Sequence, residues 1–188
     1  LKAKISDNTK AVIIVHFSGL IHPNIWEIKK YLKERNIYLI EDAAHAHGAK
    51  IDNIFAGNIG DFGCFSFYST KIMTTGGEGG FISTNNEKLF DLCSSFGAIG
   101  IDKKSKNEIY INAGSNNRLT EFQAILGISQ LNKLESFVKH RNKIAGIYKD
   151  RLSRLVEDGI IKFQGYPKNI RHPYWMFMVL IENKDYKR

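Results

Sequence analysis

The sequence predicts an α/β protein with a mostly parallel sheet, and three observations support this. Residues 11–17 form an apolar run typical of a parallel strand buried on both faces. Residues 23–36 have a proline suited to a first helical turn, followed by an amphipathic stripe. A second apolar run, residues 37–40, completes a strand–helix–strand unit. Because such crossovers are almost always right-handed, we expect neighbouring parallel strands with helices on the faces of the sheet.

The middle of the chain continues this alternation. Residues 51–60 are predicted to be a polar connection, and residues 62–68 and 80–84 are predicted to be strands. Residues 86–96 have the apolar spacing of a helix, and residues 98–112 are polar enough for a surface loop or a short hairpin.

The last third predicts helices followed by a second sheet. Thr120 and Gln123 have the spacing of a capping box, and the apolar residues from 121 to 155 indicate one long helix or two in sequence. Residues 160–163 and 174–181 are predicted to be strands of another sheet, the start of a small C-terminal domain.

Composition and charge favour an ordinary globular protein. The 188 residues are 43% hydrophobic and 12% aromatic, and no apolar run approaches the roughly 20 residues of a membrane span. The net charge of +8 is scattered, which favours a lysine-rich surface or phosphorylated ligands over nucleic acid. Cys64 and Cys93 lack the spacing of a metal site, and we expect them to be free, buried thiols of a cytoplasmic protein.

Residues 41–80 contain the pattern of a cofactor site. Asp42 follows a buried strand, at the strand end where open α/β sheets bind ligands. Lys71 follows a second strand and precedes the glycine cluster 76–80, which lets backbone approach a bulky group. A lysine in such a place can form a Schiff base with a carbonyl cofactor. Pyridoxal phosphate is the usual carbonyl, and Asp42 would be the carboxylate that keeps its ring nitrogen protonated.

Several motifs together resemble one family. They are residues 41–48 (Glu-Asp-Ala-Ala-His-Ala-His-Gly), 60–67 (Gly-Asp-Phe-Gly-Cys-Phe-Ser-Phe), the Thr70-Lys71 pair and 77–80 (Gly-Glu-Gly-Gly), with further similarity at 9–16 and 114–119. They resemble the DegT/DnrJ/EryC1/StrS family of pyridoxal-phosphate-dependent sugar aminotransferases. The resemblance implies the three-layer α/β/α large domain of fold-type I transferases, followed by a small α+β domain. It also implies transfer of an amino group, typically from glutamate, to a nucleotide-linked keto sugar for surface polysaccharide or a secondary metabolite.

The resemblance implies a role for each predicted site residue. Lys71 would be catalytic and would bind the cofactor covalently, with Asp42 at the ring nitrogen. His45, where the family most often has glutamine, would lie near the ring oxygen, and Ser66 would bind the phosphate. Asn116 would bind the phosphate of the neighbouring subunit's cofactor, so the implied assembly is a homodimer with shared sites. No metal ligand is expected. A core position for His16 and a turn at His47 are favoured over ligand roles, and Glu78 has no assigned role.

The resemblance also sets domain boundaries and alternatives. We expect residues 1–118 to be the later part of the large domain, 119–157 a helical spine, and 158–188 the start of the small domain, with the chain a fragment of a longer protein. The family's dehydratases have histidine in place of this lysine, so Lys71 favours an aminotransferase. A non-catalytic or regulatory relative is a second alternative. Residues 94–97 (Ser-Ser-Phe-Gly) replace the Arg-Asn-His-Gly of many members, so substrate preference is expected to differ.

Overall fold

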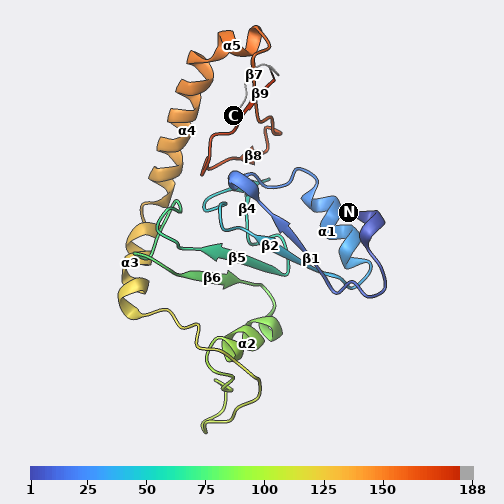
Figure 1. Ribbon diagram of the computed structural model, residues 1–188. Helices are drawn as coiled ribbons and strands as arrows, with labels where there is room; N and C mark the ends of the chain where they lie inside the picture. The colour runs from blue at the N-terminus through green and yellow to red at the C-terminus, as the bar shows by residue number, and fades with distance from the viewer. Residues whose placement is uncertain (183–188) are drawn as a thin grey trace.

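The computed structural model describes residues 1–182 and is built around a four-stranded sheet of order β1-β2-β5-β6 (Figure 1). Its strands are β1 (Ala11–Val15), β2 (Tyr38–Asp42), β5 (Phe62–Ser66) and β6 (Gly80–Ser83). The first three are parallel, and β6 is antiparallel to β5. The prediction of a mostly parallel sheet is therefore confirmed. Asp42 pairs with Val15 on one side and Cys64 on the other, at the carboxyl edge of the three parallel strands.

Helix α1 (Ile25–Lys33) connects β1 to β2, as expected, and packs against the sheet. Its Ile25 and Leu32 are fully buried in one core with Leu39 of β2. The helix begins after Asn24, whose backbone is not helical, so Pro23 precedes the first turn instead of lying in it.

Strand β1 is buried on one face only, so the expectation of two buried faces for residues 11–17 is wrong. Val12 and Ile14 pack on the core, whereas the side chains of Ile13 and Val15 are 65% and 51% exposed. The strand also ends at Val15, because a short 3-10 helix, η2 (Phe17–Gly19), turns the chain away. A similar 3-10 turn, η1 (Lys2–Lys4), precedes β1.

A second, antiparallel sheet was not expected from the sequence. It has the order β4-β3-β8 and consists of β3 (Lys50–Ile51), β4 (Ile54–Phe55) and β8 (Ile170–Arg171). Residues 51–60 are therefore not simply a polar connection. These strands have two residues each, too few for an alternating pattern, and Lys50 pairs with Arg171 from the far end of the chain.

The predicted helix over residues 86–96 is confirmed as α2 (Glu87–Phe96), with the Asn86 side chain accepting the N–H groups of Lys88 and Leu89. Residues 98–112 form the predicted loop, closed by one bridge between Ile101 and Tyr110. Cys64 and Cys93 are free but only half-buried, which corrects the expectation of buried thiols, and burial raises the pKa of both.

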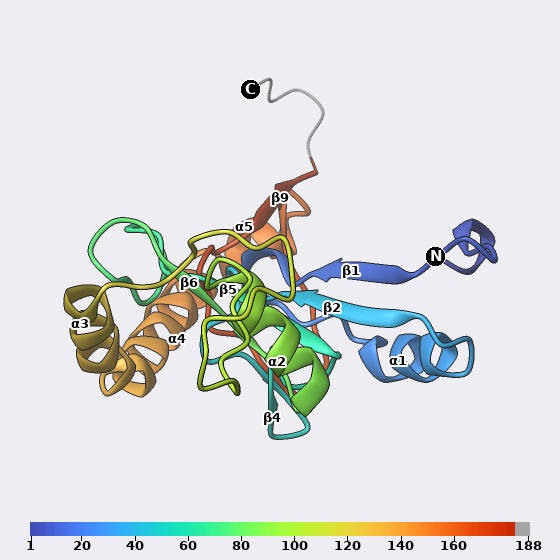
Figure 2. The ribbon, with the colours of Figure 1, turned by 90° about the horizontal axis from the view of Figure 1, so that it is seen from below.

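The helical segment divides into three helices and not one or two. They are α3 (Glu121–Leu131), α4 (Leu134–Arg151) and α5 (Ser153–Glu157). The capping box of Thr120 and Gln123 is present at the start of α3. A turn at Asn132 and Lys133 separates α3 from α4, which runs away from the sheet in Figure 1. Figure 2 shows α3 and α4 at one end of the sheet and α1 at the other.

The C-terminal strands form a separate pair, β7 (Ile161–Phe163) and β9 (Val179–Ile181). Strand 160–163 is confirmed, but the expected strand 174–181 is shorter. Tyr174 has a φ of 50°, and its carbonyl accepts a hydrogen bond from Arg141 of α4, so residues 174–178 do not extend the strand. Residues 183–188 of the predicted C-terminal domain lie outside the described residues.

Candidate active site

Asp42 lies where the sequence places it, at the carboxyl end of β2. Its half-buried carboxylate accepts the N–H of Ala44 through Oδ1 at 3.1 Å. The backbone on both sides is fixed, because the N–H of His16 donates to the carbonyl of Asp42 and the N–H of Ala43 donates to that of Cys64. The carboxylate is therefore held at the sheet edge by the parallel ladder itself.

His45 lies in the turn that follows Asp42. Its imidazole stacks on the indole of Trp175, with ring centroids 3.7 Å apart, and meets the edge of Phe17. Burial and the nearby charge of Lys71 lower the pKa of His45, and the Asp42 carboxylate opposes this effect. In the described residues, its buried Nδ1 has no hydrogen-bond partner. Asp42, His45 and Lys71 are thus brought together at one edge.

Lys71 lies in the loop between β5 and β6. Its backbone N–H donates to the carbonyl of Tyr68 at 2.9 Å, and its Nζ lies 4.6 Å from the centroid of the Trp175 ring. The loop closes through Phe67, whose N–H donates to the carbonyl of Gly79 and whose carbonyl accepts the N–H of Thr75. The lysine is held in a tight loop between two strands of the main sheet.

Ser66 ends β5 at the same carboxyl edge of the sheet. Its Oγ accepts the N–H of Tyr68 at 3.3 Å, which leaves the hydroxyl hydrogen available to donate. Glu78 fixes the glycine loop through its backbone, because its carbonyl accepts the Thr75 hydroxyl and the Gln123 side chain. Glu78 therefore has a structural role in this chain through its main chain.

His47 and His16 are both buried. His47 is 2% exposed and lies against the rings of Phe65 and Phe67. In residues 1–182 neither of its ring nitrogens makes a hydrogen bond of ordinary geometry, but the backbone of Ser66 lies close enough to favour the protonated ring. Burial and the charge of Lys71 lower its pKa to about 4. The core position expected for His16 is confirmed by its contact with Glu41 at 2.8 Å.

Asn116 is not brought to this site within the chain. It is exposed on the segment before α3, where its Oδ1 accepts the N–H of Arg118 Nε at 2.8 Å. The sequence reasoning also missed Trp175, which contacts both His45 and Lys71. No motif marks this tryptophan, because it reaches the site from residues over 100 positions downstream.

The residues present fit pyridoxal phosphate. An amine, a carboxylate and a hydroxyl with a free hydrogen lie at one sheet edge, and the buried Nδ1 of His45 beside them lacks a partner in the described chain. Native structures rarely leave buried polar atoms unpaired, so the Nδ1 of His45 fits a polar ligand at this edge. Lysine, carboxylate and hydroxyl are the groups that the cofactor requires.

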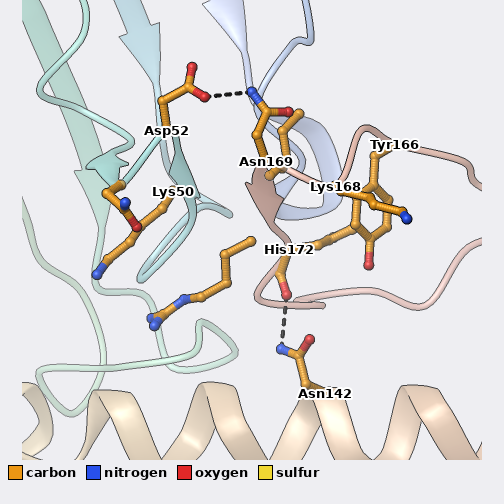
Figure 3. Close-up of a pocket in the computed structure, with 10 residues that line it drawn as sticks. Lys50, Asp52, Asn142, Tyr166, Lys168, Asn169 and His172 are labelled. Atoms are coloured by element: carbon orange, nitrogen blue, oxygen red, sulfur yellow. Dashed lines mark hydrogen bonds between the residues drawn. The ribbon is translucent and has the colours of Figure 1, made fainter.

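A cavity apart from these residues lies where β8 joins β3 (Figure 3). Asn169 there donates to Asp52 at 2.7 Å, and Asn142 of α4 donates to the carbonyl of His172 at 2.9 Å. None of the predicted site residues lines it. In residues 1–182, no helix is long and apolar enough to cross a bilayer.

The sheet and the residues at its edge define the class: the chain has the α/β fold of fold-type I pyridoxal-phosphate-dependent transferases. It belongs to the DegT/DnrJ/EryC1/StrS aminotransferase family, whose model matches residues 1–188.

Known relatives agree with this assignment. The chain is 34% identical over 188 residues to GDP-perosamine synthase of Escherichia coli O157:H7, covering 98% of this chain and 49% of that protein. It superimposes on the X-ray structure of an aminotransferase from Psychrobacter cryohalolentis with a TM-score of 0.92 and 29% identity, covering 100% of this chain and 52% of the other. E. coli GDP-4-keto-6-deoxy-D-mannose-3-dehydratase with bound hydrated pyridoxal phosphate gives a TM-score of 0.83 at 26% identity, covering 97% and 49%. The chain spans about half the length of these relatives.

Proposed function

We propose that the protein containing this chain is a pyridoxal-phosphate-dependent aminotransferase that converts a nucleotide-linked keto sugar into an aminosugar. The observation that carries the proposal is the placement of Lys71 and Asp42 around His45 at the carboxyl edge of the main sheet. The similarity to GDP-perosamine synthase supports a nucleotide-sugar substrate. The similarity to a spore coat polysaccharide biosynthesis protein of Bacillus subtilis supports a role in polysaccharide biosynthesis.

Each site residue has a specific task in this proposal. When bound, pyridoxal phosphate supplies the electron-accepting ring that the transfer of an amino group requires. Lys71 would bind the cofactor through Nζ, and the same amine would be the group that moves a proton. Asp42 holds a proton at the ring nitrogen, His45 contacts the ring oxygen, and Ser66 donates to the phosphate.

We further propose that the sites are shared in a homodimer, with Asn116 serving the partner's site. Helix α3 supports this, because its exposed apolar side chains recur every three residues and so follow one another around about half of the helix. They are Phe122 (88% exposed), Ile125, Ile128 and Leu131. Contiguous apolar surface of this kind marks a contact with another polypeptide. We expect the assembly in the cytoplasm, whose reducing conditions suit the free thiols.

A sugar dehydratase is the second candidate, favoured by the similarity to the E. coli 3-dehydratase. In the family, dehydratases have histidine at the position of Lys71, so the lysine favours amino transfer. Mass analysis of the product separates the two, since only the aminotransferase leaves nitrogen on the sugar.

The test uses the full-length protein, its Lys71→Ala variant and a Lys162→Ala control, which removes an exposed lysine on β7. We expect pyridoxal phosphate to give a visible absorbance band in the parent and the control that decreases when glutamate is added. The band should be missing from Lys71→Ala. A parent without this band, or an unchanged band in Lys71→Ala, would contradict the proposal.

A further inference from the structure

Trp175 contacts two of the proposed site residues at once. Its indole stacks on the imidazole of His45, with centroids 3.7 Å apart and planes inclined by 15°. The Nζ of Lys71 lies 4.6 Å from the centroid of the indole, within the range of a cation–π contact. One aromatic side chain thus limits the positions of both a ring and a long flexible amine.

The indole is itself fixed by polar contacts. Its Nε1–H donates to the carbonyl of Thr70, the residue before Lys71, at 3.0 Å. On the other side, the N–H of Met176 donates to the carbonyl of Ser18 at 3.4 Å, and Arg141 of α4 donates to the carbonyl of Tyr174 at 3.0 Å. The segment that carries Trp175 is therefore tied to η2, to α4 and to the lysine loop.

These contacts differ from those of a core tryptophan. Trp175 is half-buried and does not belong to the main apolar core. It packs on a histidine and a lysine, and its indole N–H donates a hydrogen bond to a carbonyl of the loop that carries this lysine. Structural packing alone does not require the indole to lie against both groups.

We propose that Trp175 is a positioning residue of the site, which orders His45 and Lys71 before the cofactor and the sugar bind. This inference rests on the proposed function, because it assumes that Lys71 receives pyridoxal phosphate. A lysine side chain has many rotamers, and ordering it in advance reduces the freedom lost on binding. Trp175 also makes the site depend on the C-terminal segment, because the indole comes from residues between β8 and β9.

The experiment compares Trp175→Phe and Trp175→Leu with Trp26→Phe in the full-length protein. Phenylalanine keeps an aromatic face and loses the N–H, whereas leucine loses both. Trp26 is the matched control, since its Nε1–H donates to Asp52 at 2.9 Å from helix α1. We expect the dissociation constant of pyridoxal phosphate to rise by about tenfold in Trp175→Leu and by less in Trp175→Phe, and to stay unchanged in Trp26→Phe.

Two further readouts separate positioning from stability. In the cofactor-free protein, acetylation of Lys71 relative to Lys162, followed by peptide mass spectrometry, should be faster in Trp175→Leu, because the amine is no longer held against the indole. In the loaded enzyme, kcat should fall more than KM for the sugar changes. Trp175→Phe and Trp26→Phe should have the same thermal unfolding midpoint. A lower midpoint in Trp175→Phe would show that this variant has lost stability as well as positioning.

Failure of the inference and failure of the proposed function give different results. A parent that forms no visible band with pyridoxal phosphate overturns the proposed function. A parent that forms this band, with cofactor affinity, Lys71 acetylation and kcat unchanged in both Trp175 variants, overturns the positioning role alone. If Trp175→Leu does not fold, the inference is judged from Trp175→Phe alone. Unchanged Lys71 acetylation and cofactor affinity in Trp175→Phe would then contradict it.

Discussion

The Nε2 of His16 lies 2.8 Å from Oε2 of Glu41, and both side chains are fully buried. Burial would raise the pKa of Glu41, but hydrogen bonds from His16 and from backbone amides outweigh it and lower this pKa. The carboxylate accepts three backbone N–H groups, from Gly57 (2.9 Å), Ile59 (2.7 Å) and Gly60 (2.6 Å). The pair connects the ends of β1 and β2 to the segment before β5, directly beside Asp42.

Glu41→Gln should therefore be strongly destabilising. The glutamine amide group would face donors that now share a carboxylate, and each hydrogen bond to a charged group contributes about 1.5–3 kcal/mol. Urea unfolding of the variant measures this loss. Glu34→Gln is the control, because its carboxylate is exposed, and it should change the free energy of unfolding by less than about 0.5 kcal/mol. Equal stability of the two variants would show that the buried network contributes little.

Acid should destabilise the fold before most carboxylates are protonated. Burial is the main cause that lowers the pKa of His47 and of His172 to about 4, from an ordinary value of 6.5. Between these values the unfolded chain binds more protons than the folded one. Stability present above pH 6.5 is therefore lost as the pH falls toward 4, by about 1.4 kcal/mol per pH unit for each histidine.

His47→Leu tests this directly. Leucine has no proton to gain, fills the space beside Phe65 and Phe67, and gives up only the weak contact with the Ser66 backbone. We expect the variant to be as stable as the parent near neutral pH and to lose stability with about half the slope in acid. Unfolding free energies measured across this range give the slope. An unchanged slope would mean that His47 titrates normally in the folded protein.

Gly63 in β5 should tolerate no side chain. A Cβ there would lie 2.3 Å from Cα of Gly57 and 2.6 Å from Oγ of Ser83, and backbone cannot move aside as a side-chain tip can. Gly63→Ala should cost about 1–3 kcal/mol or more. Gly146→Ala is the matched control, since this glycine lies within α4 with nothing within 4 Å of its added Cβ. It should stabilise by about 0.5–1 kcal/mol, and the opposite order in thermal unfolding would contradict the packing around β5.

The sequence predicts those parts of the fold that depend on local signals. The strand–helix–strand unit, the helix over residues 86–96 and the capping box of Thr120 all follow from periodicity and short-range hydrogen bonds. The sheet that joins β3 to β8 could not be predicted, because it pairs short segments over 100 residues apart. The exposure of Ile13 depends on what covers the sheet, which no local pattern records.

The same distinction holds for the site. The sequence predicts Asp42 and Lys71 as site residues because each follows an apolar strand, and strand ends have a known position in an open sheet. The structure brings both residues near His45. Trp175 was missed because its contacts arise only when the C-terminal segment folds back on the lysine loop. The structure leaves Asn116 on its own segment, so its predicted role in a partner's site remains a prediction.

Ser66→Ala should weaken cofactor binding without loss of stability. The Ser66 hydroxyl accepts the N–H of Tyr68 at the long distance of 3.3 Å, so its hydrogen is the feature that the proposed phosphate contact would use. A hydrogen bond to a charged group contributes about 1.5–3 kcal/mol, which corresponds to at least a tenfold loss of affinity for pyridoxal phosphate. Ser83→Ala is the matched control, because its hydroxyl already donates to the carbonyl of Gly57 at 2.7 Å. That variant should lose stability and keep its affinity. Absorbance titration and thermal unfolding of both variants separate the two effects, and equal affinities in Ser66→Ala and the parent would remove Ser66 from the phosphate site.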